Sequence, residues 1–209
     1  GALDVHFEIW KGESDAEPYF PRLIEILEEK GLSYRSNGAL VVDIAEPEDK
    51  KELPPCMILK SDGASLYSTS DLGTIMDREK CYPKDWYLYI ADSRQDLHYT
   101  SFFRVARKAD LLPKTTKMNF LGFGTMNGKD GKPFKTRDGG VLRLEKLIEE
   151  IQESVLKRME EGKDTGLSEE ERKETAKVIA LAALKYGDLS NQITKDYIFD
   201  LEKFTAFEG

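Results

Sequence analysis

Trp86–Ala91 is an almost unbroken apolar run, and a helical pattern and a second strand pattern follow it. Such a run predicts a strand buried on both faces of a parallel sheet. Apolar spacing predicts a helix over Leu97–Ala109, and Met118–Phe123 has the composition of the next strand. A strand, a helix and a strand with short connections form a βαβ unit. The chain is therefore expected to have an α/β fold with a parallel sheet.

Shorter patterns before this unit predict smaller elements. Alternating β-forming residues predict a strand over Val5–Trp10, and helical spacing predicts a helix over Phe20–Glu29. Between residues 31 and 68, turn signals such as Ser36-Asn37-Gly38 separate short strand patterns. We expect a small antiparallel insertion there, with strands at Ala39–Ile44, Met57–Lys60 and Ser65–Ser68. A helix is expected from Asp71 to about Lys80.

Two helices are expected towards the C-terminal end. Arg143–Glu161 carries one apolar stripe, which is typical of an amphipathic helix. Ser168 and Glu171 have the spacing of a capping box for a second helix that ends near Gly187. Lys163–Gly166 is the expected joint between them.

Composition excludes several classes of protein. With 209 residues, 40% hydrophobic and 33% charged, the chain has the composition of a soluble globular protein. No apolar run is long enough to span a bilayer, and the first residues do not predict a secretory signal, so no membrane partner is expected. A net charge of −8 argues against indiscriminate nucleic-acid binding, and no DNA partner is expected.

Cys56 and Cys81 are expected to be reduced thiols in a cytoplasmic protein. With His6 and His98 as the only histidines, a three-histidine metal site is impossible, and no protein-bound metal is expected.

Residues 122 to 140 interleave glycines with the cations Lys129, Lys132, Lys135 and Arg137. Glycine lets a loop bend closely around a ligand, and cations neutralise phosphate oxygens. The Gly122-x-Gly124 start is a poor dinucleotide fingerprint, because a basic loop follows it instead of a helix. Asn-Gly and Asp-Gly pairs in this stretch are also ordinary turn signals. A phosphate-binding loop and a solvated hairpin are both consistent with the composition.

Five polar side chains are candidates for ligand binding, and each has a plainer alternative. Asp71 can hold a cation with help from the Tyr67 hydroxyl, or it can simply favour the dipole of a helix that it begins. Gln95 follows the carboxyl end of a predicted parallel strand, where ligands bind in such sheets, but it also fits a helix cap. Glu13 follows a predicted strand and is otherwise an exposed turn carboxylate. His98 begins a helix, where capping or packing is the commoner role.

Five ordered segments of the chain resemble those of class I arginyl-tRNA synthetases. Phe7–Ser14 resembles the family's Phe-Asp-x-x-x-x-Glu-Ser, with Glu8 in place of the usual Asp, and Leu66–Leu72 resembles Leu-Tyr-x-Thr-Arg-Asp-Leu, with Ser70 in place of Arg. The remaining matches are Asp92–Tyr99 with the helix Phe102–Lys108, Gly122-Phe123-Gly124 with Gly131–Arg137, and Lys195–Asp200. Five segments in the family's order are far more specific than any one of them.

The resemblance implies that the chain folds as half of a Rossmann-like catalytic domain, and it also implies which reaction the parent enzyme catalyses. ATP, with Mg²⁺, activates L-arginine to arginyl-adenylate, and the arginyl group passes to tRNA(Arg). The family's arginine-binding positions fall on Glu13, Tyr67, Asp71 and Gln95. Its ATP-binding positions fall on His98, Gly122, Gly124 and Lys129, and its catalytic loop on Lys132, Lys135 and Arg137. The sequence 132–137 departs from the common Lys-Met-Ser-Lys-Ser form, which leaves the role of each basic residue in it open.

The resemblance also implies a division of the chain. Residues 1–30 correspond to the first strand and helix of the core, 31–68 to the insertion, 69–141 to the second half of the nucleotide-binding fold, and 142–209 to a helical connection towards an anticodon-binding domain. The family's His-x-Gly-His motif has no counterpart, because His6 and His98 are too far apart. We therefore expect an inactive fragment of a monomeric parent enzyme. The fragment is expected to expose apolar surface, through which two copies of it can pair. The alternatives are a nucleotide-binding or nucleotidyl-transfer module that acts without tRNA, and a non-catalytic interaction domain.

Overall fold

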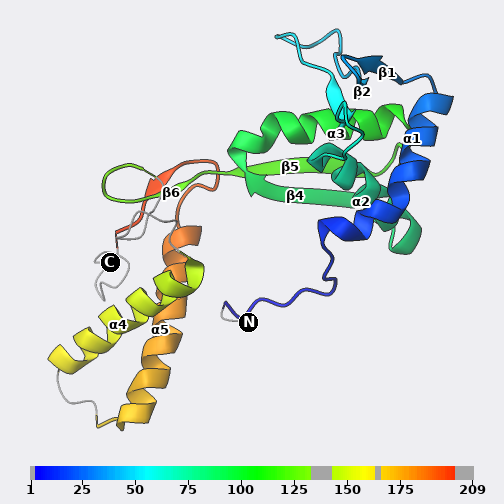
Figure 1. Cartoon of the computed structure of the whole chain (residues 1–209). Helices are drawn as coiled ribbons and strands as arrows, with labels where there is room; N and C mark the ends of the chain where they lie inside the picture. The colour runs from blue at the N-terminus through cyan, green and yellow to red at the C-terminus, as the bar shows by residue number, and fades with distance from the viewer. Residues whose placement is uncertain (1–2, 133–142, 163–165, 201–209) are drawn as a thin grey trace. The chain divides into compact units, whose positions relative to one another are not determined.

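A computed structural model describes residues 3–132, 143–162 and 166–200. The chain forms two compact units (Figure 1). One is Glu8–Gly122, and the other joins Gly1–Phe7 to Phe123–Gly209. Each unit has its own cluster of buried apolar side chains, so each has the kind of core on which a folded domain depends.

The unit Glu8–Gly122 begins with a 3-10 helix, η1 (Glu13–Tyr19), that continues into the α-helix α1 (Phe20–Glu29). Leu23 and Leu27, four residues apart, are fully buried, which confirms the expected amphipathic helix. The expected strand over Val5–Trp10 is wrong, because these residues form no strand and the side chain of Trp10 is 79% exposed. An alternating pattern becomes a strand only where a partner strand supplies hydrogen bonds, and the described residues supply none here.

An antiparallel sheet of β1 (Ser33–Ser36), β2 (Ala39–Val42) and β3 (Cys56–Leu59) confirms the expected insertion. Its first turn uses Asn37 and Gly38 at positive φ, as a tight hairpin requires. The expected strand Ser65–Ser68 is wrong, since only Ser65 bridges β3 and the helix α2 (Tyr67–Cys81) begins two residues later. The helix starts early because the Thr69 hydroxyl accepts a hydrogen bond from the amide of Leu66, 3.2 Å away.

The βαβ unit consists of β4 (Trp86–Asp92), the short 3-10 helix η2 (Ser93–Gln95), α3 (Asp96–Lys108) and β5 (Lys117–Phe123). β4 and β5 lie side by side, and the amide at the start of β5 donates to the carbonyl of Asp85, just before β4. At the other ends, Gly122 approaches Ser93. The first residues of β4 and β5 are therefore neighbours, and so are their last residues, which means that the two strands run parallel, as expected.

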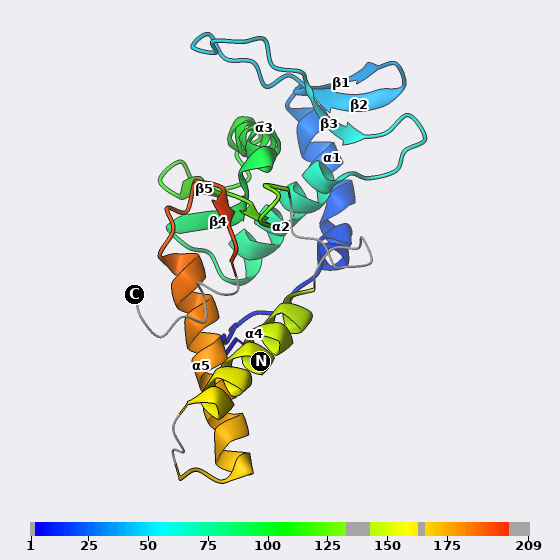
Figure 2. The same cartoon turned by 90° about the vertical axis from the view of Figure 1, so that its left-hand side faces the viewer.

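α3 covers one face of this two-stranded sheet (Figures 1 and 2). Tyr89 of β4 packs its ring 5.5 Å from that of Phe102, and Phe120 of β5 stacks on Tyr99 at 4.3 Å. On the other face, the side chains of Trp86, Leu88 and Ile90 are each about half exposed. The prediction of a strand buried on both faces is therefore wrong for the described residues, because they place a helix on one face alone.

The second unit holds α4 (Leu144–Glu161) and α5 (Glu169–Leu189), which lie side by side in both views. The stripe expected on α4 is buried against α5, and Leu147, Ile151 and Val155 form one cluster with Ala176, Ala180 and Leu184. The amide of Ser168 donates to Glu171 at 2.8 Å, which confirms the capping box, and α5 ends two residues beyond Gly187. Short strands β6 (Met126–Asn127) and β7 (Tyr197–Ile198) pair in parallel beside these helices.

Candidate functional site

A cavity of about 350 Å³ lies between α2 and the segment that leads into η1. The carboxylates of Glu13, Asp15, Asp71 and Asp77 line it, together with the cations of Lys11 and Arg78. Because four carboxylates outnumber two cations, the cavity favours a cationic ligand. Glu13 and Asp71, which lie 58 positions apart in the sequence, are thus brought to one site.

Asp71 lies in the second turn of α2 and contacts His98 of α3, with Oδ2 and Nε2 2.5 Å apart. The His98 ring also packs on Tyr99 and Phe102, with centroids 5.5 and 5.3 Å away, so α3 fixes its orientation. The Asp71 Oδ1 atom accepts no hydrogen bond from a residue that the structure describes. One oxygen of this carboxylate is thus held within the protein, while the other has its hydrogen-bonding capacity left.

Asp77 and Lys11 belong to the cavity, and the sequence patterns did not point to either. Asp77 lies in the helix α2, where a surface position is the ordinary expectation for a carboxylate. It is instead buried and forms an ion pair with Lys11. No local signal predicts this pair, because its two residues are 66 positions apart.

Tyr67 and Gln95 do not line this cavity. Tyr67 is the first residue of α2, and its side chain is 70% exposed. Gln95 ends η2, where it is exposed as well. The turn before it is held by Asp92, which accepts hydrogen bonds from the Arg94 side chain and amide, and these bonds lower the pKa of Asp92 to about 2.

Gly122 and Gly124 both lie where another backbone segment approaches closely. A Cβ atom at Gly122 would lie 2.8 Å from the Cα of Ser93, and one at Gly124 would lie 2.2 Å from the carbonyl carbon of Lys195. No side chain fits at such distances, so close packing alone explains both glycines.

The last resembling segment pairs with the start of the basic loop. The amide of Gly124 donates to the carbonyl of Ile193 at 2.8 Å, and the amide of Phe199 donates to Asn127 at 2.7 Å. Lys129 forms an ion pair with Asp200 at 3.3 Å. Two segments about 70 residues apart therefore form one structure at the base of the loop.

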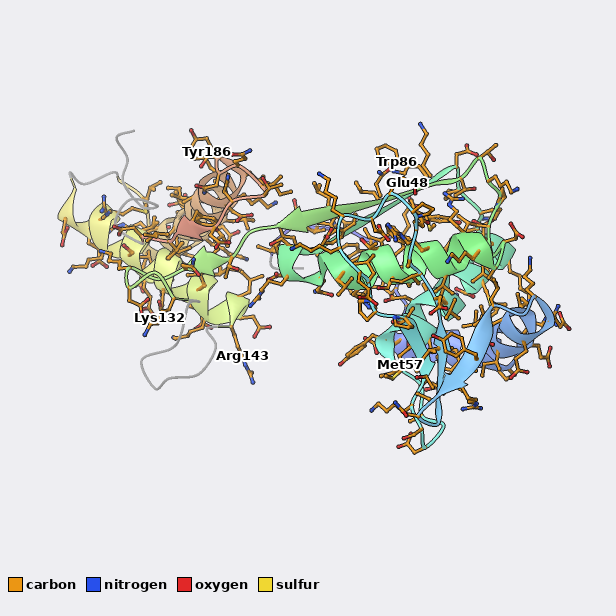
Figure 3. The ribbon with its side chains drawn as sticks, turned by 90° about the horizontal axis from the view of Figure 1, so that it is seen from above. Glu48, Met57, Trp86, Lys132, Arg143 and Tyr186 are labelled. Carbon is orange, nitrogen blue, oxygen red and sulfur yellow. The ribbon has the colours of Figure 1, made fainter. Side chains whose placement is uncertain are left out.

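The remaining basic residues are less fully placed. Lys132 is exposed, and Figure 3 marks it and Arg143, the described residues on either side of 133–142. Lys135 and Arg137 lie outside the described residues.

Within the described ranges, no group of three or more His, Cys, Asp or Glu side chains is arranged to hold a metal ion. No helix there is both long and apolar enough to cross a membrane.

The comparison with protein families decides the classification. The family described as "tRNA synthetases class I (R), catalytic domain" matches residues 1–201. The chain belongs to this family. Among curated members of this synthetase family, an arginine–tRNA ligase of Agathobacter rectalis is 57% identical over 211 residues, and one of Alkaliphilus oremlandii is 48% identical over 209 residues. These alignments cover 99% and 100% of this chain but 35% of each relative, so the chain spans about a third of their length.

Solved structures of the synthetase family share the fold. The arginyl-tRNA synthetase of Plasmodium falciparum superposes with a TM-score of 0.81 at 21% identity, over 100% of this chain and 34% of the other. That of Thermus thermophilus gives a TM-score of 0.70 at 17% identity, over 100% of this chain and 40% of the other. The expected fold class, a class I synthetase α/β fold with a small antiparallel sheet, is therefore confirmed.

Proposed function

We propose that the chain supplies the arginine-binding part of an arginine–tRNA ligase. The observation that carries this proposal is the acidic cavity between η1 and α2, in a chain of this synthetase family. A guanidinium presents a planar fork of donors that matches carboxylate oxygens, so a cavity with several carboxylates suits the arginine side chain. In this proposal the parent enzyme forms arginyl-adenylate from L-arginine and MgATP and transfers the arginyl group to tRNA(Arg).

Asp71 is the main partner of the guanidinium in this proposal. Its Oδ2 atom is held by His98, which fixes the carboxylate and leaves Oδ1 for the ligand. Glu13, from η1, would add a second negative charge to the cavity. Tyr67 precedes Asp71 by one helical turn, and in this proposal its hydroxyl would contact the ligand from outside the cavity. Gln95 would orient the amino acid from the loop that follows β4.

The basic loop would act on ATP. Lys132, Lys135 and Arg137 are proposed to stabilise the negative charge that develops on the phosphates during adenylation, and Gly122 and Gly124 to let the chain approach the nucleotide. Lys129 would exchange its contact with Asp200 for one with phosphate. His98 would approach the nucleotide from the α3 side. Mg²⁺ would enter with ATP as part of the substrate.

We further propose that the chain by itself does not charge tRNA, because it spans about a third of the length of its curated relatives. The parent would be a monomeric cytoplasmic enzyme. An aminoacylation assay with arginine, ATP and tRNA(Arg) tests the inactivity directly. Turnover by the isolated chain, above that of a preparation carrying Asp71→Asn, would contradict it.

Calorimetry with arginine and citrulline tests the cavity. Citrulline has nearly the same shape, but its side chain is uncharged, so a carboxylate pocket should bind arginine in the millimolar range and citrulline more weakly still. Asp71→Asn should weaken arginine binding by about tenfold or more, the usual effect of losing a charge-assisted hydrogen bond.

Asp62→Asn is the matched control for this test. Asp62 lies in an exposed turn outside the cavity, and its Oδ1 atom accepts from the amide of Ala64 at 2.9 Å, a role that an asparagine oxygen also fills. Arginine affinity should therefore be unchanged. Equal affinity for arginine in the Asp71→Asn and Asp62→Asn variants would refute the proposed pocket.

A further inference from the structure

Asp77 is a carboxylate with 5% of its surface exposed, and all its acceptor sites are used within the protein. Oδ1 accepts from the Tyr19 hydroxyl at 2.9 Å and from the Cys81 thiol at 3.5 Å. Oδ2 accepts from the Lys11 ammonium and from the Tyr82 hydroxyl, which is 3.2 Å away. A carboxylate offers about four lone pairs, so these four donors leave it little capacity to bind a ligand as well. Its role is therefore to hold its neighbours.

Two of these neighbours lie at the two ends of one segment. Lys11 comes just before η1, and Tyr19 is its last residue. Between them, the chain makes a local turn in which the amide of Gly12 donates to Asp15 at 2.7 Å. A single side chain of α2 thus holds both ends of the segment that carries Glu13 into the cavity.

The middle of η1 is held by the same helix. Gly73 lies one turn before Asp77 on α2, and a Cβ atom there would lie 2.9 Å from the carbonyl oxygen of Ala16. The missing side chain lets η1 approach the helix closely. Because the segment from Lys11 to Tyr19 contacts α2 at its middle and at both ends, its position is defined relative to the helix that also carries Asp71.

Tyr19 and Lys11 keep their protons at neutral pH. The hydrogen bond to Asp77 raises the pKa of Tyr19 to about 12 and also raises the pKa of Lys11 above its ordinary value. Burial opposes ionisation of Asp77, but hydrogen bonds from Lys11 and Tyr19 outweigh it and hold the pKa of the carboxyl below its ordinary value. The contacts therefore persist at the pH where a synthetase of this family would work.

We infer that Asp77 is a positioning residue for arginine: by holding Lys11 just before η1 and Tyr19 at its end, it sets the place of Glu13 relative to Asp71. This inference rests on the proposed function, because it concerns the same cavity. It predicts that arginine affinity depends on Asp77 and Tyr19, and that this dependence disappears when Glu13 is replaced. A side chain that only stabilised the fold would not show such a dependence.

Hydrogen exchange on the full chain tests the contact without any ligand. Asp77→Asn and Tyr19→Phe should both speed amide exchange in residues 12–19 relative to the unsubstituted protein. Tyr34→Phe is the matched control, because it removes a hydroxyl that donates to Asp43 at 2.8 Å in the antiparallel sheet, away from the cavity. Unchanged exchange in residues 12–19 of both variants would overturn the inference.

A double-mutant cycle tests the route to arginine. By calorimetry, Tyr19→Phe, Asp77→Asn and Glu13→Gln should each weaken arginine binding by about tenfold, and Tyr34→Phe should not. In the Glu13→Gln background, Tyr19→Phe should cause no further loss, because the group that it positions is already changed. Tyr19→Phe keeps the aromatic ring and both charges, so it remains informative if Asp77→Asn does not fold.

The outcomes separate the two hypotheses. If Tyr19→Phe weakens binding equally with Glu13 and with Gln at that position, the effect does not pass through Glu13 and the inference fails. If arginine binds and Asp71→Asn weakens it while Tyr19→Phe and Asp77→Asn do not, the inference alone fails. If the unsubstituted chain binds no arginine, the proposed function fails, and the inference fails with it.

Discussion

Replacing Thr69 by valine should destabilise the unit Glu8–Gly122 without changing its shape. Thr69 is fully buried, and its hydroxyl donates to the carbonyl of Ile58 in β3 and accepts from the amide of Leu66, 3.2 Å away. Valine has the same branched shape but no hydroxyl, so a buried carbonyl and an amide at the start of α2 each lose a partner. Loss of the contact to the amide costs about 1 kcal/mol, and the unsatisfied carbonyl costs about 1–2 kcal/mol more.

The expected loss in the free energy of unfolding is therefore about 2–3 kcal/mol, which lowers the urea midpoint by about 1–2 M. Tryptophan fluorescence is a suitable assay, because Trp10 and Trp86 are the only tryptophans of the chain and both belong to this unit. Thr74→Val is the matched control on the same helix. The Thr74 hydroxyl is only half-buried and donates to the carbonyl of Ser70, so its removal should change the midpoint little. Equal midpoints for Thr69→Val and Thr74→Val would refute the reasoning.

Three further predictions concern packing, pH and association. Gly124→Ala should lower the melting temperature of the unit that contains α4 and α5 by several degrees, measured by circular dichroism, because its Cβ atom would overlap a neighbouring carbonyl. Hydrogen bonds from Arg104 lower the pKa of Asp49 to about 2, below its unfolded value, so this pair stabilises the fold above about pH 4 and its contribution disappears as the pH falls towards 2. The difference in urea midpoint between wild type and Asp49→Asn should shrink over that range. Changing both Trp86 and Ile90 to serine should reduce self-association of the isolated chain in sedimentation velocity, because these side chains form the exposed apolar face of β4.

Each of these predictions has a control and an outcome that contradicts it. Gly162→Ala places its Cβ atom at an ordinary 3.5 Å from the nearest carbonyl, so a melting temperature as low as that of Gly124→Ala would contradict the packing argument. An Asp49→Asn difference that persists unchanged at pH 2 would contradict the assigned ion pair. For association, Met57→Ser removes an apolar side chain that is 44% exposed in β3, and it should have no effect. Self-association that survives the change of Trp86 and Ile90 would exclude the β4 face.

The elements that the sequence predicts well are those with a local cause. Leu23 and Leu27 in α1 follow helical spacing, and the Ser168–Glu171 capping box marks the start of α5 within four residues of sequence. The strand expected over Val5–Trp10 does not form, because a strand depends on a partner that the local pattern cannot reveal.

The site divides in the same way. The resemblance pointed to Glu13 and Asp71, and they meet at one cavity, but no spacing rule could show that His98 contacts Asp71 across 27 positions. Asp77 was not found at all. Its burial depends on Lys11 and Tyr19, which are donors from a distant part of the sequence, and a helical pattern by itself places a charged residue at the surface.

The division of the chain into two units has a consequence for the order of folding during synthesis. The unit Glu8–Gly122 is continuous, so all of its residues have been made once residue 122 has left the ribosome. The other unit joins Leu3, which packs against the α4–α5 cluster, to residues made about 180 positions later. Since domains fold as units and earlier ones fold first during synthesis, the acidic cavity can form well before the base of the basic loop is complete. A ribosome stalled shortly after residue 160 should therefore carry a chain with the acidic cavity formed and β6 and β7 not yet paired.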